Sequence, residues 1–147
     1  MLAEYERKLF GEPYADLERR FRAHSGPGRA LTALAERYAD QKLRVMHLAR
    51  AAGMSPTVLR ERFRRTVGIT PRQLLVGYRI KCALDLLSAG HNKISEISER
   101  VGFADITAME KAFKRILGAS PTVVREAIRA GCRGIDSPLT LKSVDLA

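Results

Sequence analysis

This chain contains two similar segments that share a pattern of glycine, phenylalanine, basic and proline residues. Residues 53–71 read GMSPTVLRERFRRTVGITP, and residues 102–121 read GFADITAMEKAFKRILGASP. Both begin with glycine, carry a phenylalanine followed by two basic residues (Phe63 and Phe113), and close with Gly-x-Thr/Ser-Pro. Each copy, with the apolar stretch before it, predicts a short helix, a tight turn at glycine and a second helix of about three turns, which is a helix-turn-helix unit.

Helical spacing and helix punctuation extend on both sides of the two copies. Ser55 and Asp105 are predicted N-caps of the second helix of each unit, and Thr70 and Ser120 precede prolines that begin the helices after them. The helix at about 71–89 is long and joins the two units. No segment alternates as a strand does. The sequence therefore predicts an all-α fold with two helix-turn-helix subdomains joined by a long central helix.

The predicted domain organisation has three parts. Residues 1–28 form a short N-terminal helical extension, in which Tyr14, Leu17 and Phe21 share one face, and residues 24–28 (HSGPG) are a predicted linker because two glycines and a proline interrupt a helix. Residues 29–130 form the main domain, with the first unit at about 43–70 and the second at about 94–130. Residues 131–147 are a tail that we expect to be poorly ordered. The apolar face of the extension either packs on its own domain, which we favour, or forms a dimerisation helix.

Charge is concentrated in the main domain. The formal net charge is +10, and residues 29–130 hold 19 basic against 9 acidic side chains, so the flanking segments are balanced. A concentrated positive domain indicates a polyanionic partner. The alternative is a solvated basic surface without a partner.

The two copies keep the residues that build the unit and differ on the outer face of the second helix. A helix inserted in a major groove presents that face to base edges and phosphates. We predict DNA contacts there in both units. In the first unit these residues are Ser55, Thr57, Arg60, Glu61, Arg64 and Arg65. In the second unit they are Ile106, Thr107, Glu110, Lys111, Lys114 and Arg115. The alternative is that any duplicated helical pair keeps its core while its surface drifts.

Residues 30–128 resemble the DNA-binding domain of the AraC/XylS family of bacterial transcription regulators. The second copy carries the most diagnostic residues, which are Gly102, Phe103, Asp105, Phe113, Lys114, Gly118, Ser120, Pro121 and Arg125. The resemblance implies a sequence-specific regulator whose two recognition helices enter successive major-groove segments of double-stranded DNA, with bending of the DNA. Glu61 stands where members usually have arginine, and Glu110 where a small hydroxyl is common. Either carboxylate could accept from cytosine or pair with a neighbouring basic residue.

Two other classes of function compete with this interpretation. The first is a helix-turn-helix protein with weak or lost sequence readout, through Glu61 and Glu110, that acts through protein partners such as RNA polymerase. The second is a small enzyme, which would need a reactive thiol with a base. Cys82 lies beside Lys81 in mid-helix and Cys132 has no nearby histidine. We therefore expect no enzyme activity, no catalytic residue and no metal or other cofactor.

Location and ligand follow from what the chain lacks. No apolar run is long enough for a membrane span, and the N-terminus does not read as a secretory signal. We expect a cytoplasmic, nucleoid-associated protein. The residues before the family match are too few for an effector pocket of ordinary size, so no small-molecule pocket is expected. The chain is then a stand-alone regulator or a fragment of a longer one.

Overall fold

The computed structural model describes residues 2–90 and 93–132, and all regular structure in these residues is helical, which confirms the all-α prediction. The predicted tail begins at residue 131, but residues 131 and 132 belong to the last helix, and residues 133–147 lie outside the described residues. The helices are α1 (Leu2–Phe10), α2 (Tyr14–Arg22), α3 (Ser25–Arg37), α4 (Val45–Ala52), α5 (Pro56–Val67), α6 (Pro71–Ser88), α7 (Ile94–Arg100), α8 (Ile106–Leu117) and α9 (Pro121–Cys132).

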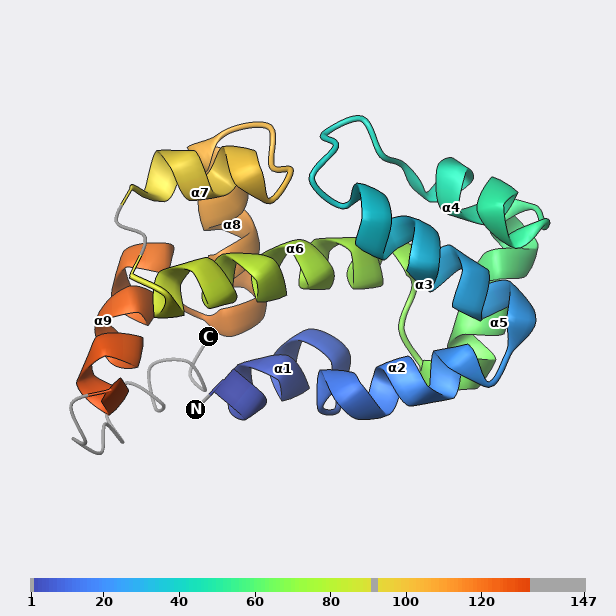
Figure 1. The fold of residues 1–147 in the computed structure, drawn as a ribbon, viewed down its shortest axis with the longest axis horizontal. Helices are drawn as coiled ribbons and strands as arrows, with labels where there is room; N and C mark the ends of the chain where they lie inside the picture. Colours follow the sequence, from blue (N-terminus) through green and yellow to red (C-terminus); the bar gives the residue numbers. More distant parts are fainter. Residues whose placement is uncertain (1, 91–92, 133–147) are drawn as a thin grey trace.

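Helix α6 runs through the middle of the molecule and separates two groups of helices (Figure 1). Helices α3, α4 and α5 gather at one end, and α7, α8 and α9 at the other. Residues on several sides of α6 are buried, among them Leu74, Ile80, Leu84 and Leu87. The long helix is therefore a shared core element of both units rather than an exposed connector.

Side-chain caps begin the helices where the sequence predicted them. Ser55 Oγ accepts the Val58 amide at 3.2 Å, and an Asp105 carboxylate oxygen accepts the Ala108 amide at 2.8 Å. At the start of α6, Thr70 Oγ1 accepts the Gln73 amide and the Gln73 side chain accepts the Thr70 amide, which makes a capping box. Helices α5 and α8, the second helix of each unit, both end at a glycine with positive φ.

The predicted linker at 24–28 is wrong, because α3 already begins at Ser25. Pro27 lies in the first turn, where a missing N–H costs nothing. Gly26 and Gly28 permit close packing. A Cβ on Gly26 would overlap the Met54 methyl group, and a Cβ on Gly28 would lie 3.1 Å from the Phe21 carbonyl oxygen. The extension therefore runs into the main domain with only two residues between α2 and α3.

The N-terminal extension packs on both halves of its own chain. On α2, Leu17 and Phe21 are fully buried, and the Phe21 ring lies 4.8 Å from the Phe63 ring of α5. Helix α1 packs along α6 and also contacts α8. Gly77 of α6 makes room for Phe10, whose ring carbon Cε1 would lie 2.9 Å from an added Cβ. The apolar face that could have served dimerisation is thus covered within the chain.

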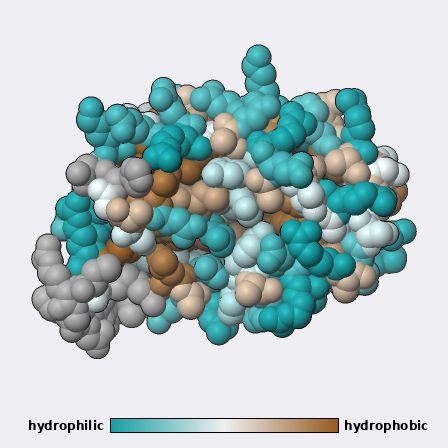
Figure 2. Space-filling model, viewed as in Figure 1, coloured by the Kyte–Doolittle hydropathy of each residue, from teal (hydrophilic) through white to brown (hydrophobic). Residues whose placement is uncertain are grey.

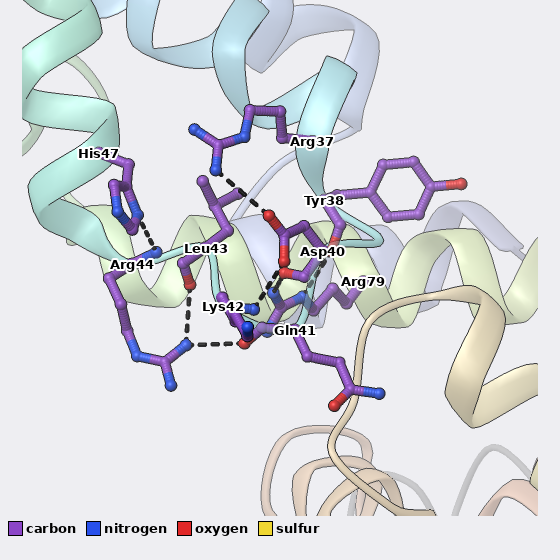
Figure 3. Close-up of polar contacts among 9 residues, drawn as sticks. All are labelled: Arg37, Tyr38, Asp40, Gln41, Lys42, Leu43, Arg44, His47 and Arg79. Atoms are coloured by element: carbon purple, nitrogen blue, oxygen red, sulfur yellow. Dashed lines mark hydrogen bonds and ion pairs between the residues drawn. The ribbon is translucent and has the colours of Figure 1, made fainter.

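One buried arginine joins the segment between α3 and α4 to the central helix. Arg79 of α6 donates from Nε to the Tyr38 carbonyl and from a terminal nitrogen to the Asp40 carbonyl, each at 2.9 Å (Figure 3). Gly102, in the turn of the second unit, has φ +93°, and a Cβ there would overlap the same Tyr38 carbonyl. The loop between α3 and α4, helix α6 and the second turn therefore meet at one point.

Candidate nucleic-acid interface

Helix α5 has a buried face and a charged outer face, as predicted. Leu59 and Phe63 are fully buried. Val58, whose helical spacing also predicts a core position, is instead 43% exposed. The six residues predicted for this unit are all exposed, and they are Ser55, Thr57, Arg60, Glu61, Arg64 and Arg65. Ser55 also serves as the N-cap of the helix.

Glu61 pairs with two arginines of its own helix. Its carboxylate oxygens lie 3.7 Å from a terminal nitrogen of Arg64 and 3.6 Å from Nε of Arg65. The sequence left two roles open for this carboxylate, a contact with cytosine or a pair with a neighbouring basic residue, and the second is present in the structure. Exposed pairs of this kind contribute little stability, so a phosphate could replace the carboxylate at small cost.

Helix α8 repeats the arrangement with a different charge balance. Met109 and Phe113 are fully buried on one face. On the other side Thr107, Lys111, Lys114 and Arg115 are exposed, whereas Ile106 and Glu110 are half-buried. Among the described residues, no carboxylate lies within ion-pair distance of the two lysines or of Arg115. The two faces thus carry the same number of basic residues, but only on the first does a carboxylate pair with them in the described structure.

A basic groove lies where the two units meet. A concavity of about 370 Å³ is lined by residues from the start of α4, from α6, and from the second unit's turn and recognition helix. Lys111 and Arg115 of α8 share this groove with Arg44 and Arg72. Arg44 donates to the Gln41 carbonyl at 2.7 Å and to the Leu43 carbonyl at 3.1 Å (Figure 3). We call this concavity the inter-unit groove.

Sequence reasoning missed Arg44 and Arg72, since both lie outside the recognition helices. Arg44 immediately precedes α4, and Arg72 is the second residue of α6. A basic residue next to a predicted helix start is a weak signal by itself, because most such side chains are simply solvated. Only the packing of α8 against α6 brings these arginines beside Lys111 and Arg115.

A larger concavity of about 620 Å³ lies between α1, the start of α6 and the end of α8. This differs from the expectation that the chain would contain no pocket of small-molecule size. That expectation considered the N-terminal segment alone, whereas α1 supplies only one wall and the two units supply the rest. We call this concavity the N-terminal groove.

The described residues contain no group of three or more His, Cys, Asp and Glu side chains placed to hold a metal ion. None of their helices is both long and apolar enough to cross a membrane. Burial raises the pKa of the Cys82 thiol, which is the opposite of what a nucleophile needs. The Cys132 side chain lies outside the described residues.

The surface as a whole is polar. Figure 2 shows that one face of the molecule is covered mainly by hydrophilic residues, with hydrophobic residues in small separate patches. The large apolar side chains found exposed among the described residues are Met46, Val58 and Val123, on three different helices. A broad apolar docking surface is therefore not a feature of this face.

Comparison with known proteins places these features in a family. Residues 48–127 match the family described as a helix-turn-helix domain. The raffinose operon transcriptional regulatory protein of Pediococcus pentosaceus is 33% identical over 84 residues, which cover 57% of this chain and 30% of that protein. The arabinose operon regulatory protein of Escherichia coli (strain K12) is 31% identical over 99 residues, covering 67% of this chain and 32% of that protein.

Solved structures agree with these matches. The crystal structure of the DNA-binding domain of AdpA, a global transcriptional factor, was determined in complex with a target DNA. It superimposes with a TM-score of 0.63 at 32% identity, covering 69% of this chain and 91% of that chain. The chain thus spans nearly all of a solved DNA-binding domain but only about a third of the length of the two curated relatives.

Proposed function

The chain belongs to the AraC/XylS family of helix-turn-helix transcription regulators, and from this premise we propose that it binds double-stranded DNA sequence-specifically and regulates transcription. Helices α5 and α8 are the recognition helices in this proposal, each entering one of two adjacent major-groove segments. The observation that carries the proposal is the pair of units with buried inner faces and basic outer faces, attached to one central helix.

Each outer face has side chains suited to a different part of the duplex. Arg60 and Arg64 of α5 can donate to guanine O6 and N7, and Lys111 and Lys114 of α8 can donate to base edges or phosphates. The exposed Val58 can contact a thymine methyl group. These assignments make Glu61 and Glu110 the residues that limit which bases are accepted.

The inter-unit groove extends the contact between the two major-groove segments. The phosphate backbone must pass between the recognition helices when both are engaged. Arg44, Arg72 and Arg115 are exposed, line this groove and would neutralise phosphates there. Phosphate contacts position the protein without reading sequence, so their loss should weaken binding to all sequences alike.

Further partners are proposed on the basis of the family. We propose RNA polymerase as a partner and the nucleoid in the cytoplasm as the location, because bacterial DNA and its polymerase are found there. A homodimer is also compatible with the family, although the apolar face of α2 is covered by its own chain. Any dimer would therefore use another surface. A two-hybrid assay against polymerase subunits, and light scattering of the purified chain, test these two partners separately.

Selection of bound duplexes from a random pool tests the central proposal. We expect a motif with two parts about one helical turn apart. On the selected duplex, Arg64→Ala and Lys111→Ala should each lower affinity by about 1–3 kcal/mol, and a base-contacting residue should also relax preference at its position.

Arg19→Ala provides a matched control for the loss of a positive charge. Arg19 is an exposed arginine of α2, 76% exposed at its side chain, and belongs to neither unit. Its removal should change affinity only slightly. Binding that is indifferent to sequence, or an equal loss in all three variants, would refute sequence-specific recognition by α5 and α8.

A further inference from the structure

The N-terminal groove has a strongly cationic lining. Four basic side chains line it, and they are Arg7, Lys8, Arg72 and Arg115. Among the described residues that line it there is no acidic side chain. The groove is contributed by three separate segments, so its charge is assembled by the fold and not by a run of basic sequence.

In the described part of the chain, the three arginines among these four side chains have no carboxylate partner. No ion pair within the described part of the chain involves Arg7, Arg72 or Arg115. Several other arginines of the chain are paired, as in the contact of Arg20 with Glu12 and that of Arg37 with Asp40 at 3.2 Å. Gathering unpaired like charges in one concavity is unfavourable unless an anion reduces their repulsion. The groove is therefore suited to a bound anion.

The groove also has an apolar side. Leu9 is nearly buried, while Ile69, Val76 and Ile116 pack against the core and remain partly exposed in the groove. The remaining polar side chains there, Thr70 and Gln73, already bond to each other's amides in the capping box of α6. What is left for a ligand is the guanidinium groups of Arg7, Arg72 and Arg115 around partly exposed aliphatic carbon.

This combination identifies the kind of ligand. A volume of about 620 Å³ lies within the range of small-molecule sites. A phosphodiester backbone would not bury the aliphatic surface of Leu9, Ile69, Val76 and Ile116. A molecule with an acidic group on an apolar body would contact both the basic groups and this aliphatic surface. We propose that the N-terminal groove binds an amphiphilic anion, a phosphate or carboxylate carried on an aliphatic or aromatic body.

Binding there is connected to the DNA interface. Arg72 and Arg115 line both the N-terminal groove and the inter-unit groove. An anion held in the first groove neutralises charge that the second groove would offer to phosphate. This coupling between the two grooves rests on the proposed function. The ligand is expected to weaken DNA binding, and DNA to weaken ligand binding by the same factor.

Calorimetry with the full chain and no DNA tests the site itself. Octyl phosphate is the probe. Octanol, which has the alkyl chain but no charge, and inorganic phosphate, which has the charge but no alkyl chain, are the two controls. Octyl phosphate should bind at least about tenfold more tightly than either fragment, since only it uses both features. Arg7 lies on α1, and Arg7→Gln removes its charge-assisted contact with the phosphate. This substitution should therefore weaken octyl phosphate binding by about tenfold. Arg19→Gln, outside the groove, should leave it unchanged.

The effect on DNA is measured separately, with the selected duplex and octyl phosphate below its micelle concentration. Wild type should lose DNA affinity as the ligand is added, while Arg7→Gln should keep its DNA affinity and lose this response. Binding of octyl phosphate no tighter than inorganic phosphate, or equal binding by Arg7→Gln, would overturn the site. A loss of DNA affinity in Arg7→Gln without ligand would also overturn it, since the groove would then hold the DNA backbone. Selective octyl phosphate binding by a chain that binds no DNA would support the site and refute the proposed function.

Discussion

Although the chain belongs to a family of DNA-binding proteins, we predict that Arg79 has a structural role. Replacing it tests how much its bonds to the segment between α3 and α4 stabilise the fold. It is 8% exposed and donates two hydrogen bonds of 2.9 Å to the carbonyls of Tyr38 and Asp40. Burial lowers the pKa of Arg79, but a guanidinium stays charged at any ordinary pH. Arg79→Met fills a similar space and leaves both carbonyls without this donor.

The expected loss follows from these two bonds. Hydrogen bonds to a charged group contribute about 1.5–3 kcal/mol each, and part of the total is offset because the variant no longer buries a charge. We therefore expect Arg79→Met to lower the free energy of unfolding by about 2–4 kcal/mol. For a domain of this size that corresponds to a fall in Tm of about 10 °C.

Thermal and urea unfolding followed by circular dichroism measure this change. Arg79→Lys keeps the charge but has no fork that reaches two carbonyls, so its stability should lie between wild type and Arg79→Met. Arg72→Met is the matched control, since Arg72 is exposed on the same helix and should change stability by less than about 0.5 kcal/mol. A stability of Arg79→Met within that same range would refute the argument, as would Arg79→Lys being as stable as wild type.

Three other features of the structure lead to predictions. Glu61→Gln releases the two arginines that it pairs with, so affinity for random duplex should rise and the slope of log K against log salt should steepen by about one; an unchanged slope would mean that this face does not meet phosphate. Gly102→Ala should lower the free energy of unfolding, measured with urea, by about 2 kcal/mol or more, because φ is +93° and the added Cβ would overlap backbone atoms. Gly90 has a similar φ of +91° with nothing within 4 Å of an added Cβ, so Gly90→Ala should cost only about 1 kcal/mol. In a Cys132→Ser chain, Cys82 should react with iodoacetamide more slowly at pH 8 than free cysteine, since burial raises the pKa of its thiol; an equal rate would contradict the burial.

The short-range features of this fold could be predicted from sequence because they depend on neighbours in the chain. Ser55, Thr70 and Asp105 bond to amides three residues ahead, so a cap and its partner are read from one short segment. The repeat of glycine and phenylalanine at matching positions identified both units. Helical periodicity then placed the charged side chains of α5 and α8 opposite Phe63 and Phe113.

Predictions failed where the deciding partner lies far away in sequence. Gly26 and Gly28 suggested a linker, but Met54 and Phe21 pack against them and make them part of α3. Val58 has the spacing of a core residue, yet the described helices leave it 43% exposed. Apolar spacing of Tyr5 and Leu9 was the available signal for α1, and it could not reveal that this helix lies against α6 and α8.

The sequence by itself determined the kind of helix unit, its duplication and the residues on each outer face, because hydrogen bonds and periodicity within a helix are local. The tertiary structure alone decided what the basic residues between the helices do. Arg79 is buried against two carbonyls, Arg44 and Arg72 line a groove, and Arg7 faces a second one. In the sequence all four are arginines in or beside a helix. Their roles differ because burial, and the charges brought nearby by packing, set the free energy of a guanidinium group.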